Sequence, residues 1–283
     1  MRLTGEVSGM SVQQIEGKML SGGEVSRPAR PAEVLGGALL DGVQRGLDRT
    51  LSVWYGVVWD YIFERFEPYK ALRREIMELV EASVQGSVTR RDVRLLEIGC
   101  GPGNFAFTMA EAGFSVVGLD PYAPLIELAR ERRRAKHLSN LAFQHADLAN
   151  GNTFPDEAFD QVVNIHTLYV HPTPDRLIRQ AYRVLKSGGH AVFVNHGSRI
   201  ALRSAFRDVR RREGLGPAIR SLLWMLPNAI FEMVRRRVGP HYWNEREFAR
   251  HLDEAGFTVL DVRRTFFNRA SVLAWVRKDA GHP

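Results

Sequence analysis

The sequence predicts a doubly wound α/β fold, in which helices cover both faces of a mostly parallel sheet. The first observation is a rhythm. From residue 91 to residue 197, short apolar runs alternate with longer segments of helical character. The second is a glycine-rich loop, Gly99 to Gly103, directly after the first apolar run. The third is Asp120 at the end of the second run, because such sheets bind ligands at the carboxyl ends of their strands.

The expected elements follow one another in the order that this fold needs. We expect five strands, at residues 94–98, 115–119, 141–145, 159–165 and 189–195. Helices are expected between them, at residues 104–112, 124–134 and 174–185. After residue 195 the alternation stops, and it resumes with a helix at 245–255 and strands at 258–264 and 271–277. The last two strands predict an antiparallel hairpin that completes a Rossmann-like seven-stranded sheet.

The segments around this core predict five parts. We expect a flexible leader at 1–34, a helical cap at 35–90, the cofactor-binding core at 91–197, a helical lid insertion at 198–242 and a completing segment at 243–283. The leader lacks the long apolar stretch of a signal peptide.

Within the cap, aromatic residues recur at intervals of three and four, which predicts an amphipathic helix. Pro68 is expected to end that helix, and a second helix is expected at 71–81.

Charge and cysteine content restrict the partners. A formal charge of +7 permits nucleic acid or an anionic membrane surface, but no aromatic residues are interleaved with the arginine runs as base stacking requires. We therefore expect no nucleic-acid partner. Cys100 is the only cysteine, which excludes an intramolecular disulfide and favours a cytoplasmic location. No apolar stretch is long enough to span a bilayer. Residues 222–234, followed by three arginines, are compatible with peripheral membrane contact.

The glycine loop and its flanking acids indicate an adenosine-type cofactor. Asp120 is placed to accept hydrogen bonds from ribose hydroxyls. The pattern Gly101-x-Gly103-x-x-Ala106 also fits the loose dinucleotide fingerprint. Glu97 favours S-adenosylmethionine instead, because a carboxylate beside the loop repels a pyrophosphate but suits an ammonium group. A dehydrogenase-type domain, or one without a cofactor, remains the alternative.

Residues 97–103 resemble the glycine loop of class I S-adenosylmethionine-dependent methyltransferases. Residues 143–148, 154–160 and 185–189 resemble three further segments of that family, with Ser187 where proline is usual.

The resemblance implies the residues that hold the cofactor. Glu97 would organise the ammonium group, the loop glycines would shape the methionine pocket, and Asp120 would bind the ribose. The adenine would lie near Pro121 and Tyr122 and against Asp147 and Leu148, with Asn164 lining the cleft toward the acceptor. The implied cofactor residues are Glu97, Gly99, Gly101, Gly103, Asp120, Pro121, Tyr122, Asp147, Leu148 and Asn164. For Asp147 the alternative is a helix N-cap.

The polar segment after the fourth strand supplies the candidate catalytic residues. His166 is the candidate general base, because its ordinary pKa suits that task. Tyr169 is a candidate for orienting an acceptor oxygen, and His171 is either catalytic or caps the loop. A histidine that is hydrogen-bonded without a catalytic role is the alternative for both. We expect no metal site.

The expected function is methyl transfer to an oxygen or carbon of an apolar or aromatic small molecule, such as a secondary metabolite or a quinone. The alternatives are a lipid head-group N-methyltransferase and a non-catalytic subunit that binds S-adenosylmethionine. The Asn/Asp-Pro-Pro-Tyr/Phe tetrapeptide of amine-directed nucleic-acid enzymes is missing after the fourth strand. Large rings of the cap and the lid either enclose the acceptor or pack the lid against the core: Trp54, Tyr55, Trp59, Trp224, Phe231, Tyr242 and Trp243.

Overall fold

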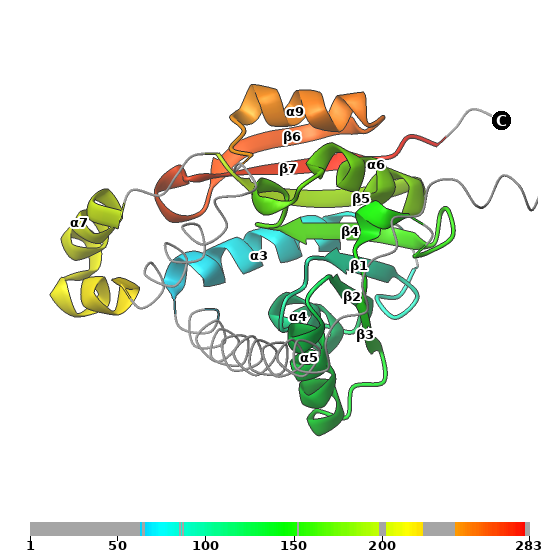
Figure 1. The fold of residues 1–283 in the computed structure, drawn as a ribbon, viewed down its shortest axis with the longest axis horizontal. Helices are drawn as coiled ribbons and strands as arrows, with labels where there is room; N and C mark the ends of the chain where they lie inside the picture. Colours follow the sequence, from blue (N-terminus) through cyan, green and yellow to red (C-terminus); the bar gives the residue numbers. More distant parts are fainter. Residues whose placement is uncertain are drawn as a thin grey trace, which may run out of the picture. The chain divides into compact units, whose positions relative to one another are not determined.

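The structure, a computed structural model, describes residues 63, 66–84, 86, 88–151, 153–197, 202–222 and 241–280. The expected leader, most of the cap and residues 223–240 of the expected lid lie outside this part of the chain. Five of the seven rings proposed above lie there too. The described residues form one seven-stranded sheet with helices on both faces (Figure 1).

The strand order is β3-β2-β1-β4-β5-β7-β6. The first five strands of this order run parallel, and β7 is antiparallel to both of its neighbours. The predicted hairpin is therefore confirmed. The strands are β1 (Arg94–Ile98), β2 (Ser115–Asp120), β3 (Leu141–His145), β4 (Phe159–Ile165), β5 (Leu185–His196), β6 (Thr258–Thr265) and β7 (Ser271–Arg277).

Alternation along the strands separates two hydrophobic layers. Leu95 of β1 packs in the layer that contains α3, α4 and α5, whereas Leu96 packs in the layer that contains α6 and α9. The same alternation occurs in β4, at Val163 and Val162. The helices are α3 (Glu67–Ala82), α4 (Asn104–Glu111), α5 (Ala123–Ala135), α6 (Pro174–Val184), α7 (Leu202–Glu213) and α9 (Glu245–Glu254), and the short 3-10 turns are η1 (Leu148–Asn150), η2 (Leu168–Val170) and η3 (Phe267–Arg269).

Two element boundaries differ from the prediction by more than one residue. The helix expected at 71–81 begins four residues earlier, because Pro68 lies in its first turn, where a missing N–H has no partner to lose. The strand expected at 189–195 begins at Leu185, since residues 185–189 form an irregular start of β5 with Gly188 at φ +78°. Gly188 and Gly189 are typical of a loop, so the sequence did not indicate that the strand already begins before them.

The order in which strands are added to the sheet changes sides between β1 and β4. It passes from β1 outward to β2 and β3, and then returns to β4 on the other side of β1. A crevice at the carboxyl ends of such a pair is where doubly wound sheets bind ligands. Figure 1 shows the turn after β1 and the segment after β4 at this edge. The fold therefore brings Gly99 and His166 to the same end of the sheet.

Among the helices of the described ranges, none has the combination of length and apolarity that crossing a bilayer requires.

Candidate functional site

Glu97 is a buried carboxylate at the end of β1. Its side chain is 4% exposed, and its Oε2 atom has no hydrogen-bond partner among the described residues. Burial raises the pKa of Glu97 to about 8, and the nearby Asp120 adds to this rise, although the Ala106 N–H opposes it. A buried acidic atom without a partner is costly unless a ligand supplies one. The buried Glu97 carboxyl is therefore compatible with a cationic group.

The loop after β1 needs glycine for two different reasons. Gly99, Gly101 and Gly103 all have positive φ, at +72°, +53° and +85°. A Cβ atom at Gly99 would lie 2.1 Å from Oγ1 of Thr167, which follows His166. A Cβ atom at Gly101 would meet nothing within 4 Å. Gly99 thus lets the loop pack against the segment after β4, while Gly101 borders open space that a ligand can use.

Phe143 of β3 packs beneath the same loop. A Cβ atom at Gly103 would lie 2.5 Å from the Phe143 ring, and one at Gly118 of β2 would lie 2.7 Å from it. Cys100 is also buried here, and burial raises the pKa of its thiol well above the ordinary value. A protonated, enclosed thiol packs as a small apolar group rather than acting as a nucleophile.

Asp120 joins the loop to the segment after β2. Its Oδ2 accepts the Gly101 N–H at 2.9 Å, and its Oδ1 accepts the Tyr122 N–H at 2.8 Å. The carboxylate is 6% exposed, whereas Pro121 and Tyr122 lie on the surface, with Tyr122 44% exposed. The structure thus places the Asp120 carboxylate, Pro121 and the exposed aromatic ring of Tyr122 together at the end of β2.

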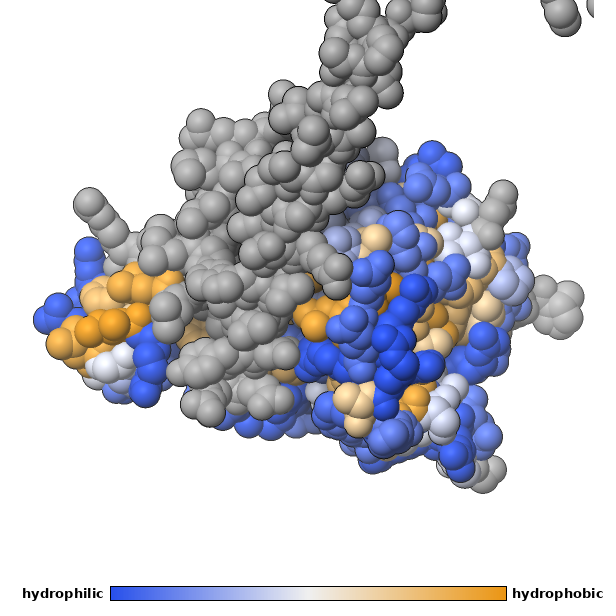
Figure 2. All heavy atoms as spheres, turned by 60° about the horizontal axis from the view of Figure 1, so that its bottom comes forward, coloured by the Kyte–Doolittle hydropathy of each residue, from blue (hydrophilic) through white to orange (hydrophobic). Residues whose placement is uncertain are grey.

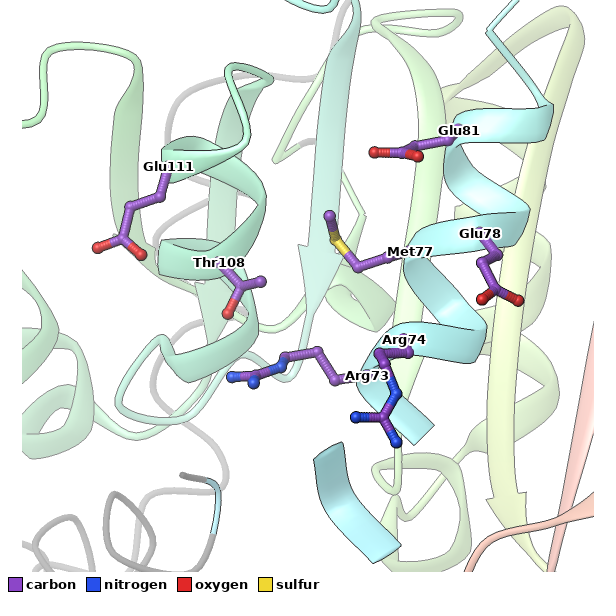
Figure 3. A pocket seen from close by; sticks show the side chains of 7 residues that line it. All are labelled: Arg73, Arg74, Met77, Glu78, Glu81, Thr108 and Glu111. Carbon is purple, nitrogen blue, oxygen red and sulfur yellow. The ribbon is translucent and has the colours of Figure 1, made fainter. Parts of the chain in front are cut away.

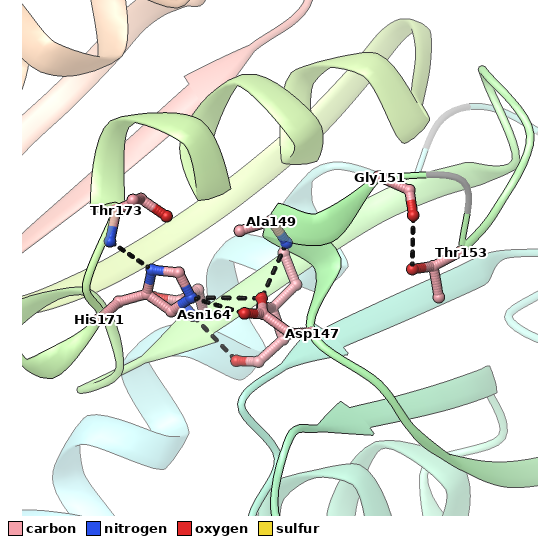
Figure 4. A network of polar contacts seen from close by, with 8 residues as sticks. Asp147, Ala149, Gly151, Thr153, Asn164, His171 and Thr173 are labelled. Carbon is pink, nitrogen blue, oxygen red and sulfur yellow. Dashed lines mark hydrogen bonds and ion pairs between the residues drawn. The ribbon is translucent and has the colours of Figure 1, made fainter. Parts of the chain in front are cut away.

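Asp147 and His171 form a pair across two loops (Figure 4). Asp147 is the N-cap of η1, where its Oδ1 accepts the Ala149 N–H at 2.8 Å. Nδ1 of His171 accepts the Thr173 N–H at 3.1 Å, so the proton lies on Nε2, which is 3.2 Å from Asp147 Oδ1. Both ring nitrogens of His171 are therefore engaged. The cap expected as an alternative for Asp147 is present, and His171 contacts Asp147 through Nε2.

Asn164 and Leu148 lie deeper than the other predicted residues. Asn164, near the end of β4, is fully buried and donates from Nδ2 to the Ile98 carbonyl at 2.9 Å. Its Oδ1 has no partner among the described residues. Leu148 is 1% exposed and packs in the layer with α6. Asn164 therefore holds the ends of β1 and β4 together, and Leu148 anchors η1.

His166 belongs to a cluster that sequence reasoning found only in part. It follows β4 with φ +51°, a left-handed conformation that is unusual for a residue other than glycine. Its Nε2 lies 2.8 Å from Ser271 Oγ, and its Nδ1 lies 3.5 Å from Tyr69 Oη. Its ring stacks on that of His196 at a centroid distance of 4.1 Å and an angle of 2°. Burial lowers the pKa of His166 well below its ordinary value, and lowers that of His196 to about 4.

Strand pairing and aromatic rings complete this cluster. Ser271 begins β7 and pairs with His196, the last residue of β5, and its Oγ lies 3.3 Å from His196 Nδ1. Tyr169 stands edge-on to His196 at 4.6 Å, and Phe266 lies 4.6 Å from Tyr69 and 5.0 Å from His166. Sequence reasoning missed Tyr69, His196 and Ser271. A histidine at the carboxyl end of an apolar strand was the one available signal.

The predicted lid ring Trp243 is a core residue instead. It is 8% exposed, stacks on His251 at 4.1 Å and packs against Phe248. Tyr242, beside it, stacks on Tyr169 at 6.3 Å. Of the two lid rings that the structure describes, Tyr242 contacts Tyr169 of the cluster, whereas the Trp243 ring packs with Phe248 and His251.

A separate groove of about 460 Å³ lies between α3 and α4 (Figure 3). Its lining includes Arg73 and Arg74 from α3 and Thr108 and Glu111 from α4. Glu111 already pairs with Lys136 at 2.6 Å. None of the predicted site residues lines this groove, so the candidate site remains at the carboxyl edge of the sheet.

Comparisons with known proteins concern the family and the fold of this chain. Residues 63–262 match the family model described as "Methyltransferase domain". A phosphatidylethanolamine N-methyltransferase of Cereibacter sphaeroides is 29% identical over 48% of this chain and 67% of its own length. A fatty-acid O-methyltransferase of Mycolicibacterium smegmatis is 30% identical over 49% of this chain and 52% of its own length.

A solved structure titled as the [4+2]-cyclase SpnF has a TM-score of 0.54, with 20% identity over 75% of this chain and 84% of that chain. That likeness supports the fold alone. The match spans only about half to two thirds of the two curated relatives. The family match nevertheless covers well over half of the chain, which therefore belongs to the class I S-adenosylmethionine-dependent methyltransferases.

Proposed function

We propose that this enzyme transfers a methyl group to an oxygen or carbon of an apolar or aromatic small molecule. The observation that carries the proposal is the polar cluster around His166, which aromatic rings enclose at the carboxyl ends of β4 and β5. Thr167, the next residue, packs against Gly99 of the cofactor loop. An acceptor held by the cluster would therefore lie next to the cofactor.

S-Adenosylmethionine fits the residues at the ends of β1 and β2. The ammonium group of its methionine part would give the unpartnered Glu97 Oε2 a cationic partner. Asp120 would accept the ribose hydroxyls, and the exposed Tyr122 ring offers a surface for the adenine. Asp147, fixed by the Ala149 N–H and by His171, is available to the adenine amine.

The cofactor supplies a methyl group that its sulfonium already activates. The chain's own task is then to align the acceptor with that methyl group and to remove a proton where the acceptor must lose one. His166 is the proposed base, because its imidazole follows β4 beside the cofactor loop, and burial, which lowers its pKa, keeps it neutral before the reaction. Tyr169 and Tyr69 would hold the acceptor's single polar group while Phe266 contacts its apolar part.

A lipid head-group amine is the second candidate acceptor. The relative from Cereibacter sphaeroides is named for such an activity, while the relative from Mycolicibacterium smegmatis is named for transfer to a fatty-acid oxygen. An amine with a free lone pair needs no base at the moment of attack. Loss of turnover on removing the His166 imidazole therefore favours oxygen or carbon, and full retention favours the amine or a subunit without catalytic activity.

The described part of the expected lid also fits contact with an anionic lipid surface. Leu215 and Ile219 are 58% and 54% exposed on the helical stretch 215–222, and Arg210 and Arg211 are exposed at the end of α7. Figure 2 shows an apolar surface at this end of the molecule beside hydrophilic surface. Exposed aliphatic side chains beside arginines are typical of helices that lie on membranes. The sequence placed this contact at 222–234, of which only Leu222 is described.

The function is tested with purified protein, S-adenosylmethionine carrying a labelled methyl group, and an extract of the source cells treated with RNase and protease. We expect label in one organic-soluble product, identified by mass spectrometry as one methylene heavier than its precursor. Asp120→Ala should reduce labelling, whereas Arg74→Ala, in the groove beside α4, should not. Labelling that disappears after the RNase or protease treatment would refute a small-molecule acceptor.

A further inference from the structure

Ser271 lies between two histidines, and its hydroxyl can donate to the ring nitrogen of one while accepting from that of the other. Its hydroxyl has one hydrogen, which it donates to one imidazole nitrogen while its oxygen accepts from the other. The facing atoms are His166 Nε2 at 2.8 Å and His196 Nδ1 at 3.3 Å. Ser271 bridges both nitrogens in this way when one of them carries a proton and the other does not.

The surroundings favour this bridging arrangement. Ser271 is fully buried and His196 is 8% exposed, so water cannot easily replace either partner. The two rings are parallel at 4.1 Å, which holds both facing nitrogens toward the same hydroxyl. The backbone N–H of His166 donates to the Val194 carbonyl at 2.8 Å, and Ser271 of β7 pairs with His196 of β5. The backbone thus fixes the geometry independently of the side chains.

We propose that Ser271 and His196 are positioning residues which couple to His166 and take over the proton that it receives. The proposal rests on the function proposed above. In the starting state, His166 carries its proton on Nε2 and donates it to Ser271, and Ser271 donates to His196 Nδ1. Nδ1 of His166 then carries no proton, and its lone pair faces Tyr69 Oη at 3.5 Å. This is the atom that would accept the acceptor's proton.

The proton transfer balances along this line. The acceptor's O–H bond breaks, and an N–H bond forms at His166 Nδ1. The N–H bond at His166 Nε2 breaks as an O–H bond forms at Ser271 Oγ, whose original proton moves to His196 Nδ1. The acceptor oxygen would gain the methyl group that the cofactor supplies, and one positive charge would reside on His196 instead of on the cofactor. Neither an oxidant nor a further reactant is needed.

The arrangement is tested by nitrogen-15 NMR of the full chain with labelled histidine, at one pH near neutrality and without an acceptor. In the wild-type protein we expect a proton on one of the two facing nitrogens and not on the other. In Ser271→Ala, the tautomer of at least one of the two histidines should change, and Ser271→Thr should restore the wild-type pattern. His190→Gln, in the middle of β5, is the matched control and should leave both tautomers unchanged.

Two results would overturn the proposal. One is a wild-type protein in which both facing nitrogens are protonated or both are not. The other is Ser271→Ala with both tautomers unchanged, while bound S-adenosylhomocysteine shows that the variant is folded.

Release of S-adenosylhomocysteine in the presence of the cell extract gives a second, kinetic measurement. Ser271→Ala should lower turnover by roughly 10-fold at unchanged cofactor affinity, the effect of losing one hydrogen bond between neutral groups. A wild-type protein without turnover would refute the proposed function, but the tautomer result would still decide the coupling.

Discussion

Gly99 and Gly101 offer a comparison in which two similar substitutions should have different effects. Both residues have positive φ, so alanine at either position costs about 1–2 kcal/mol in backbone strain. Only at Gly99 would the new Cβ collide, since it would lie 2.1 Å from Thr167 Oγ1 and 2.9 Å from Thr167 Cβ. An extra methyl group forced into such a packed contact costs about 1–3 kcal/mol more. The expected loss of stability is therefore about 2–5 kcal/mol for Gly99→Ala and about 1–2 kcal/mol for Gly101→Ala.

Urea unfolding followed by circular dichroism measures both losses, with the slope of the transition checked for each variant. The entropy that alanine removes from the unfolded chain is the same in both variants and cancels in the comparison. Thr167→Gly should recover part of the loss in Gly99→Ala, with a coupling of about 0.5–3 kcal/mol. Cofactor affinity should fall more in Gly101→Ala than in Gly99→Ala. The Cβ at position 101 enters the open space beside Asp120 that the cofactor would use. Equal destabilisation by the two alanines, or undiminished S-adenosylhomocysteine binding by Gly101→Ala, would refute this reasoning.

Three further predictions concern other parts of the molecule. His166→Gln should lower turnover by about 10²–10⁴-fold at unchanged cofactor affinity, while His190→Gln should match the wild type; equal turnover in steady-state assays would exclude a general base. Since Glu97 has a folded-state pKa of about 8 against an ordinary value of 4.5, its contribution to stability is present below pH 4.5 and is lost as the pH rises toward 8. Relative to the wild type, Glu97→Gln should therefore gain stability over this range, by at most about 1.4 kcal/mol per pH unit in urea unfolding, and a constant difference would contradict the assigned burial. Leu215→Ser combined with Ile219→Ser should weaken sedimentation with phosphatidylglycerol vesicles by about 10-fold or more, whereas unchanged sedimentation would remove this face from the membrane.

The part of the site that lies at strand ends could be predicted from the sequence. Glu97, Asp120 and Asn164 each end or nearly end an apolar run, and parallel strands bring such residues to one edge. The alternation of apolar runs and helices was equally informative, so all seven strands were expected. Local patterns carry this information because each depends on residues close together in the chain.

The rest of the site depends on contacts between distant residues. Ser271 meets His166 because β7 enters the sheet antiparallel beside β5, and the register of that pairing is not visible in a single sequence. His171 was considered as a catalyst or a cap, but its partner Asp147 lies in another loop. The start of α3 was predicted four residues too late for a different reason, since a proline that ends one helix and a proline that begins another look alike.

The ring of Phe143 determines the order in which two glycines near it could be substituted. Gly103 and Gly118 both exclude a side chain because of that one ring, but Gly103 also has φ +85°, whereas Gly118 lies in the regular strand β2. A smaller residue at position 143 would therefore release Gly118 alone, apart from a tight contact of 3.0 Å with Cys100 Sγ. A side chain at position 118 therefore requires that Phe143 be replaced by a smaller residue first. Position 103 stays glycine in either case, because of its positive φ.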